Sequence, residues 1–143
     1  MKLHVSVAQP PLAGFVNIDA AKQPVDLGNV EDFCEASECT QIIINDVLKF
    51  MPYDKLPFVV QHLATRLRHR GQITFIFTDV NSIIREFNCG SIDEKMLNQL
   101  LFQNGSNSCF SFSYIERILK AVRLNVKEIS ISKEQVRMIA ERP

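Results

Sequence analysis

The chain has 143 residues, the size of one ordinary domain, and its 46% hydrophobic and 22% charged content is typical of a globular protein. Its 16 basic and 16 acidic side chains cancel, which excludes the broad positive field that nucleic-acid binding usually needs. No apolar run approaches the roughly 20 residues of a membrane span, and the first residues lack the pattern of a signal peptide. We therefore expect a soluble, cytoplasmic single domain over residues 1–143, with no membrane and no nucleic-acid partner.

Two short strands open the chain. The pattern predicts them over Lys2–Val7 and Phe15–Asp19. The link between them, residues 8–14, contains two prolines and a glycine and is typical of a loop. Because parallel strands usually need a crossover of about a dozen residues or more, a parallel pair here would have its connecting helix reduced to a turn.

The next segment leads to a central strand. Pro24–Leu27 is a candidate for a brief strand, and Val30–Ala36 is a polar segment suited to one or two helical turns. Gln41–Asp46 contains an unbroken run of isoleucines, which is typical of a strand covered on both faces, as in a parallel sheet.

A helix is predicted after this strand. Asp54 is expected to cap its first turn, in which Pro57 is tolerated. Apolar residues at helical spacing form one stripe, which we expect to be buried. The stripe comprises Leu56, Val59, Val60, Leu63 and Leu67.

A basic cluster marks the predicted end of this helix. We expect Arg66, Arg68 and Arg70 to load the last turn, where the helix dipole favours cations, and Gly71 to stop the helix. A phosphate or partner site is the alternative explanation for the same cluster.

The second half of the chain alternates a strand with helices. Ile73–Thr78 is predicted as another central strand, and Ser82–Phe87 as a short helix. Capping boxes at Ser91–Glu94 and Ser113–Glu116 predict two more helices. The apolar residues of these helices are Met96, Leu97, Leu100 and Leu101 in the first, and Ile115, Ile118, Leu119 and Val122 in the second.

The last two predicted strands are Val126–Ser132 and Gln135–Ala140. Their link, Lys133 and Glu134, is so short that the two strands must form an antiparallel hairpin. The whole pattern is that of an α/β domain with a mostly parallel sheet and a C-terminal antiparallel hairpin.

Metal chemistry is not indicated. The four cysteines show no paired CxxC spacing, so we expect reduced thiols. Cys34 and Cys39 with His62 or His69 lack the spacing of a zinc finger, and no metal site is predicted. We expect His4, on the first strand, to pack within the sheet.

Polar residues follow several of the predicted strands. Asp19, Asn45, Asp46 and Asp79 all stand at the ends of strands. Open α/β sheets bind ligands in a crevice at the carboxyl ends of their strands. The sequence therefore predicts a ligand site at this edge.

The chain resembles the small class I S-adenosylmethionine-dependent methyltransferases. Lys2–Asp19, KLHVSVAQPPLAGFVNID, is similar without a gap to their opening LNLGCGxxPLPGYVNVD. Ile44–Leu56, INDVLKFMPYDKL, is similar to SHVLEHFPYDEL, and Leu67–Ile73 to LKPGGKL. Ser111–Ser113 and the helix after it resemble the late FT-x-E-x-L segment. The resemblance covers essentially the whole chain and implies a three-layer Rossmann-like fold.

The resemblance also implies a cofactor site for S-adenosylmethionine. Its first loop would comprise Ser6, Val7 and Ala8, with Ser6 and Ala8, and often Gln9, at glycine positions of the family. A side chain where the loop needs a positive φ costs about 1–2 kcal/mol. Asp19 would accept hydrogen bonds from both ribose hydroxyls; the alternative is that it caps the turn after its strand.

The remaining implied roles are at the next strand ends. Asn45 and Asp46 would lie beside the cofactor, and Asp79 beside the substrate. The family's VLEH segment is Val47–Phe50 here, without its acid and histidine. Methyl transfer can proceed largely through proximity and alignment, so this loss does not exclude catalysis.

Two functions follow from the resemblance. The first is a methyltransferase-like enzyme acting on a small-molecule, sugar or peptide acceptor. The second is a pseudoenzyme, a non-catalytic binding or assembly module with a protein partner or a second copy. The Ser6–Ala8 loop distinguishes them, because its glycines are missing.

Overall fold

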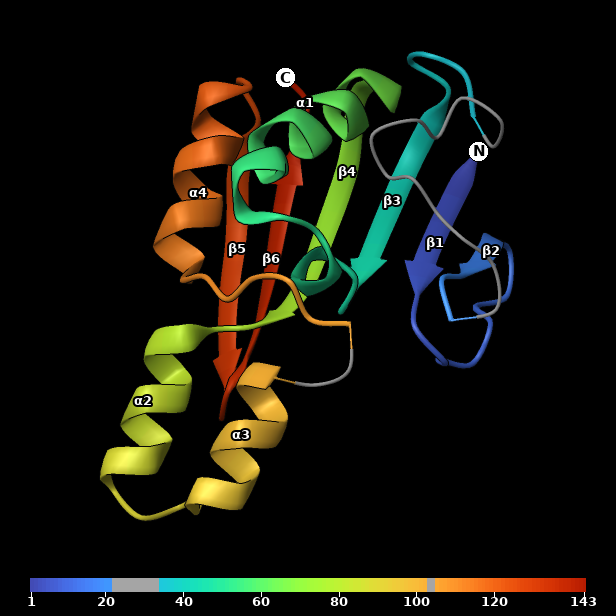
Figure 1. Cartoon of the computed structure of the whole chain (residues 1–143). Helices are drawn as coiled ribbons and strands as arrows, with labels where there is room; N and C mark the ends of the chain where they lie inside the picture. The colour runs from blue at the N-terminus through green and yellow to red at the C-terminus, as the bar shows by residue number, and fades with distance from the viewer. Residues whose placement is uncertain (22–33, 103–104) are drawn as a thin grey trace.

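The computed structural model describes residues 1–21, 34–102 and 105–143. Its six strands form one sheet in the order β2-β1-β3-β4-β6-β5 (Figure 1). The strands are β1 (Lys2–Ser6), β2 (Val16–Asp19), β3 (Cys39–Asn45), β4 (Leu67–Thr78), β5 (Asn125–Ser132) and β6 (Gln135–Glu141).

The sheet is mixed. The pairs β1–β2, β1–β3 and β3–β4 are parallel, whereas β4–β6 and β5–β6 are antiparallel. The predicted C-terminal hairpin is therefore confirmed, and parallel pairing is limited to the N-terminal half of the sheet. Residues 7–15, all of them described, connect two parallel strands without a helix, as expected. The predicted strand at Pro24–Leu27 lies outside the described residues, as does most of the segment Val30–Ala36.

Four helices and two short 3-10 turns complete the described part of the chain. The turns are η1 (Leu48–Phe50) and η2 (Tyr53–Lys55), and the helices are α1 (Leu56–Arg66), α2 (Val80–Asn88), α3 (Glu94–Phe102) and α4 (Phe112–Ala121). In the part of the chain that the structure describes, no helix is long and apolar enough to cross a membrane.

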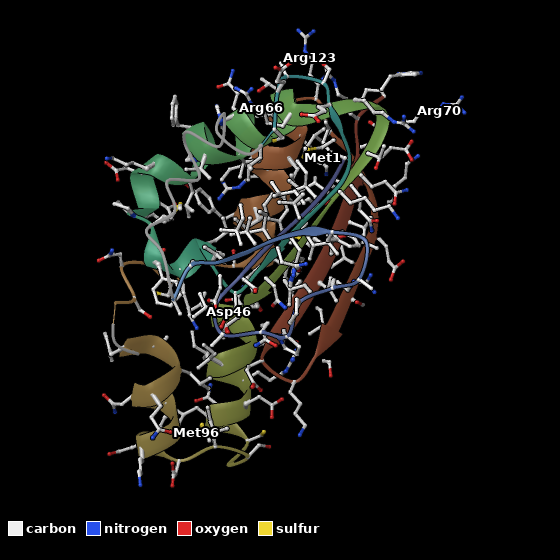
Figure 2. The ribbon with its side chains drawn as sticks, turned by 90° about the vertical axis from the view of Figure 1, so that its right-hand side faces the viewer. Met1, Asp46, Arg66, Arg70, Met96 and Arg123 are labelled. Atoms are coloured by element: carbon white, nitrogen blue, oxygen red, sulfur yellow. The ribbon has the colours of Figure 1, made fainter. Side chains whose placement is uncertain are left out.

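One face of the sheet carries the hydrophobic core. On β3, Ile42 and Ile44 are fully buried, whereas Ile43 between them is only half-buried. Figure 2 shows α1 and α4 on the same side of the strands. Among the described residues the expected three-layer arrangement is thus represented by the sheet and one helical layer.

The predicted helix stripes form this core. All five stripe residues of the first helix, Leu56 to Leu67, are buried, and so are Ile115, Ile118 and Leu119 of α4. The two helices therefore cover the sheet through the residues that their periodicity predicts. In contrast, α3 has no buried residue, and α2 and α3 project beyond the carboxyl edge of the parallel strands (Figure 1).

The predicted helix caps are wrong by one or two positions. Helix α1 follows Lys55 without a side-chain cap, because Asp54 lies in η2. Asp93 caps the first turn of α3, accepting a hydrogen bond of 2.8 Å from the Met96 N–H. Ser111 caps α4. The reason for this early start is tertiary, since the Phe112 N–H is held by Asp79.

The predicted end of the first helix is also wrong. Helix α1 ends at Arg66, and Arg68 and Arg70 belong to β4. Leu67 is fully buried and pairs with Cys39, so the chain enters the sheet directly after the helix. Gly71 does not stop a helix: a Cβ there would lie 2.8 Å from the Cys39 carbonyl oxygen, a close approach between two strands that only glycine permits.

Candidate functional site

Three parallel strands end side by side at the predicted site. In the sheet register Ser6 pairs with Asp19 on one side and with Asn45 on the other. The structure therefore brings together three residues that are far apart in the sequence. Asp46 follows β3 directly, and its N–H donates to the Ile76 carbonyl across to β4 at 2.8 Å.

Asp19 connects the end of β2 to the first loop. Its Oδ1 atom accepts hydrogen bonds of 3.0 Å from the backbone N–H of Ala8 and of Ala21. The Ala20 N–H donates to the Ser6 carbonyl at 2.8 Å, parallel to this link. The carboxylate therefore caps the turn after its strand, as the alternative expectation has it, and also contacts the backbone of the first loop.

The first loop contains one residue in a backbone conformation that glycine adopts more readily than other residues. Ala8 has a φ of 52°, in the left-handed region. The side chain of Val7 packs against the hydrophobic core, while Gln9 is exposed. Ser6 is buried, so its contribution to a ligand would come from its backbone. The loop thus keeps its turn despite a side chain at the strained position.

Asn17 holds the rest of this loop, and sequence reasoning did not single it out. Its side chain accepts a hydrogen bond from the Leu12 N–H at 2.8 Å and donates to the Leu12 and Phe15 carbonyls at 2.9 Å each. Its Oδ1 also lies 2.9 Å from Nδ1 of His4. His4 is 2% exposed, which confirms that it packs within the sheet. The sequence signal that could have identified Asn17 is its position, two residues before Asp19 at the strand end. The sheet register pairs Asn17 with His4, so both side chains lie on the same face of the sheet.

In the segment after β3, a lysine neutralises the charge of Asp46, and the loop before α4 packs on this segment. Asp46 has a φ of 57°, and its Oδ2 forms an ion pair of 2.8 Å with Nζ of Lys49. The Lys49 carbonyl accepts hydrogen bonds from the N–H groups of Asn107 and Ser108 at 2.7 and 3.1 Å. The loop before α4 therefore packs on the turn after β3, and Lys49 contributes both the cation that pairs with Asp46 and the carbonyl that holds this loop.

Asp79, for which a contact with a substrate was expected, has a structural role in the fold. It is 1% exposed. Its Oδ2 accepts from the Ser82 N–H and Oγ at 2.9 and 2.8 Å, and its Oδ1 from the Phe112 N–H at 2.8 Å. The carboxylate caps α2 and anchors the start of α4, so its oxygens are directed into the protein.

The cysteines contribute no acidic thiol to this site. Cys34 and Cys39 are buried, and burial together with the neighbouring Cys34 raises the pKa of Cys39 to about 12. Within the described residues, no group of three or more His, Cys, Asp or Glu side chains is arranged to hold a metal ion.

Comparison with known proteins identifies the fold. No protein-family model matches the sequence, and a search of curated proteins returns no match. Solved structures do match. An O-methyltransferase family protein from Burkholderia thailandensis has a TM-score of 0.63 at 13% identity, over 90% of this chain and 36% of that one. Magnesium protoporphyrin IX methyltransferase from Synechocystis PCC 6803, with bound S-adenosylhomocysteine, has a TM-score of 0.55 at 15% identity. The match covers 90% of this chain and 51% of that one.

A third match covers nearly the whole of both chains. It is a SAM-dependent methyltransferase from Archaeoglobus fulgidus, with a TM-score of 0.64 at 8% identity, over 99% of this chain and 86% of that one. The chain spans only 36% and 51% of the first two structures. At such low identities the likeness concerns the fold alone: this is a class I methyltransferase-like α/β fold.

Proposed function

We propose that this domain binds S-adenosylmethionine at the carboxyl edge of its parallel strands and acts as a methyltransferase-like protein. The observation that carries the proposal is the hydrogen bond from the Ala8 N–H to Asp19. It joins the first loop, in a left-handed turn, to an acid at the end of the neighbouring parallel strand. In dinucleotide-binding folds the loop after the first strand holds the pyrophosphate, and an acid further along the chain holds a ribose.

The residues present suit the nucleoside half of the cofactor best. A carboxylate at the end of β2 is an acceptor for ribose hydroxyls. Asp19 is partly exposed and is oriented by two backbone N–H groups, which would fix its position before a ligand arrives. Ser6, Val7 and Ala8 would offer backbone groups to the amino-acid half, and Asn45 its side-chain amide.

The ion pair with Lys49 neutralises the charge of Asp46 at the end of β3. An unpaired carboxylate there would attract the cationic cofactor, whereas the paired one presents little net charge. When bound, S-adenosylmethionine supplies an electrophilic methyl group. This chain would contribute binding and alignment rather than a general base, because its VLEH-equivalent segment carries neither acid nor histidine. The acceptor would be a small molecule, a sugar or a peptide.

Calorimetric titration with S-adenosylhomocysteine and S-adenosylmethionine tests the proposal. We expect a dissociation constant below about 100 μM, or roughly −5.5 kcal/mol. Asp19→Asn should weaken binding about tenfold or more, since it removes the anionic acceptor. Asp54→Asn, which changes an exposed acid in η2, is the matched control and should bind like the natural chain.

The opposite result is equally informative. If neither ligand gives heat or a thermal shift at millimolar concentration, the cofactor proposal fails. The same fold would then serve as a non-catalytic module.

A further inference from the structure

A surface groove runs between α1 and α4. Two hollows of about 400 and 410 Å³ lie along these helices. Both are lined by Gln61 of α1 and by Ala121 and Val122 at the end of α4, so the two hollows adjoin, and together we call them the α1–α4 groove. None of the residues assigned to the cofactor lines it, and the groove is therefore independent of the proposed function.

The floor of the groove is suited to a peptide. Ala64, Ala121 and Val122 present small apolar side chains, which allow another backbone to approach closely. The groove follows α1 from Pro57 to Thr65, which corresponds to about 12 Å at 1.5 Å per residue. This length fits a few residues of a peptide segment and is short for a folded domain.

The charge of the groove is one-sided. Arg117 lines one hollow, and Arg123 and Arg142 line the other, whereas no Asp or Glu among the described residues lines either. If a C-terminal carboxylate on Pro143 is counted as well, the three guanidinium groups that line the groove still outnumber the carboxylates there. In a chain whose formal net charge is zero, this is a local concentration of positive charge. Figure 2 shows Arg123 at the end of the molecule far from Asp46.

Two of these arginines are held in place. Arg142 donates from one guanidinium nitrogen to Ser37 Oγ at 3.1 Å and to the Leu67 carbonyl. Arg117 lies over the Tyr114 ring, 5.8 Å from its centroid. Guanidinium groups that are already oriented lose less conformational entropy when they meet a carboxylate.

Aromatic side chains flank the Arg117 end. Tyr53 stacks on Tyr114 with their centroids 4.5 Å apart, and Tyr53 is 51% exposed. Phe58, on α1 beside Pro57, is 64% exposed. Such solvent-exposed rings are typical anchors of protein interfaces.

We propose that the α1–α4 groove docks an acidic segment of a partner protein that also carries large apolar side chains. Its carboxylates would meet the three arginines, and its apolar side chains would lie on the small-residue floor and against the exposed rings. The chemistry favours this occupant over a nucleic acid, because the chain has a formal net charge of zero and lacks the broad positive field that nucleic-acid binding usually needs.

The test uses a short fluorescein-labelled peptide of glutamate, leucine and phenylalanine, and the same peptide with glutamine for glutamate. Fluorescence polarisation should show binding of the acidic peptide only, weakening as salt is raised. Amide NMR shifts on binding should be confined to the groove and the residues that flank it, 53–65, 114–124 and 141–142.

Matched variants make the test specific. Arg117→Glu combined with Arg123→Glu should weaken binding by about fivefold or more, because two attractions become repulsions. Lys95→Glu, a charge reversal on the exposed side of α3, should leave binding unchanged. Ala121→Trp should block the floor without a charge change. Unchanged NMR spectra outside the groove verify that each variant is folded.

Three results would overturn the proposal. They are equal binding of the acidic and neutral peptides, shifts centred outside the groove, and binding of an RNA oligonucleotide or anionic lipid vesicles as tight as that of the acidic peptide. The last would identify a general polyanion site and not a protein-docking groove.

Discussion

The carboxylate of Asp19 accepts a 3.0 Å hydrogen bond from the N–H of Ala8, a residue held at a φ of 52°. A side chain in this conformation is costly, and the hydrogen bond is one of the contacts that stabilise it. The hydrogen bond helps to explain how a loop with alanine at a positive φ forms a tight turn at the carboxyl edge. It also yields a direct test of how much strain the loop stores.

Ala8→Gly should stabilise the domain. Glycine adopts positive φ without the Cβ clash, which gains about 1–2 kcal/mol and is partly offset by its greater freedom in the unfolded chain. We expect the free energy of unfolding in urea to rise by about 0.5–1 kcal/mol. Ala121→Gly, in the last turn of α4, is the control and should lower it. A loss of stability in Ala8→Gly would show that Ala8 is not strained.

Asp79→Ala should destabilise the domain strongly. The substitution leaves the buried N–H of Ser82 and the partly buried N–H of Phe112 without their acceptor. Each unsatisfied buried group costs about 1–3 kcal/mol, so a total loss of about 2–5 kcal/mol is expected in urea unfolding. Asp54→Asn at the exposed η2 turn should change stability little. If the variant unfolds at the same urea concentration as the natural chain, Asp79 does not stabilise the fold and is again a candidate contact for a substrate.

The sheet and the buried helix faces could be predicted from the sequence because both depend on hydrophobic periodicity. The isoleucine run of β3 and the stripe from Leu56 to Leu67 are local signals of this kind. The errors are at element ends, where contacts distant in sequence decide. Helix α4 starts at Phe112 because Asp79 holds its N–H, and β4 starts at Leu67 because that residue pairs with Cys39.

The candidate site was predictable to a similar extent. Strand-end acids and the family resemblance place Asp19 beside Ser6, as the sheet register does. The ion pair between Asp46 and Lys49 was not predictable, because it depends on the left-handed backbone at Asp46. The hydrogen bonds of Asn17 were not predicted either, since its partners are mainly backbone groups of the loop.

The ion pair between Asp46 and Lys49 should contribute a measurable coupling energy to the stability of the domain. The side chain of Lys49 is 14% exposed and that of Asp46 33%, so solvent screens the pair less than a fully exposed one. We expect a double-mutant cycle with Lys49→Met and Asp46→Asn to give about 0.5–1.5 kcal/mol in urea unfolding. Asparagine suits the second site because it tolerates a positive φ. The same cycle on Lys120 and Glu116 of α4 is the control and should give less, since Lys120 is 67% exposed. A coupling near zero would show that the pair does not organise the turn after β3.

The four cysteines should differ in the rate at which their thiols react. Hydrogen bonding to Ser91, whose Oγ lies 3.1 Å from Sγ, lowers the pKa of the exposed Cys89 below its ordinary value of 9.0. More thiolate is then present at neutral pH, and thiolate is the reactive form. Burial instead raises the pKa of Cys34, and that of Cys39 to about 12.

Alkylation with iodoacetamide followed by mass spectrometry should therefore modify Cys89 first and the exposed Cys109 second. Cys34 and Cys39 should react only when urea unfolds the chain. Ser91→Ala should slow the reaction of Cys89 and leave that of Cys109 unchanged, because it removes the hydrogen bond that favours the thiolate. Faster modification of Cys109 than of Cys89 in the natural chain would contradict this account of the α2–α3 turn.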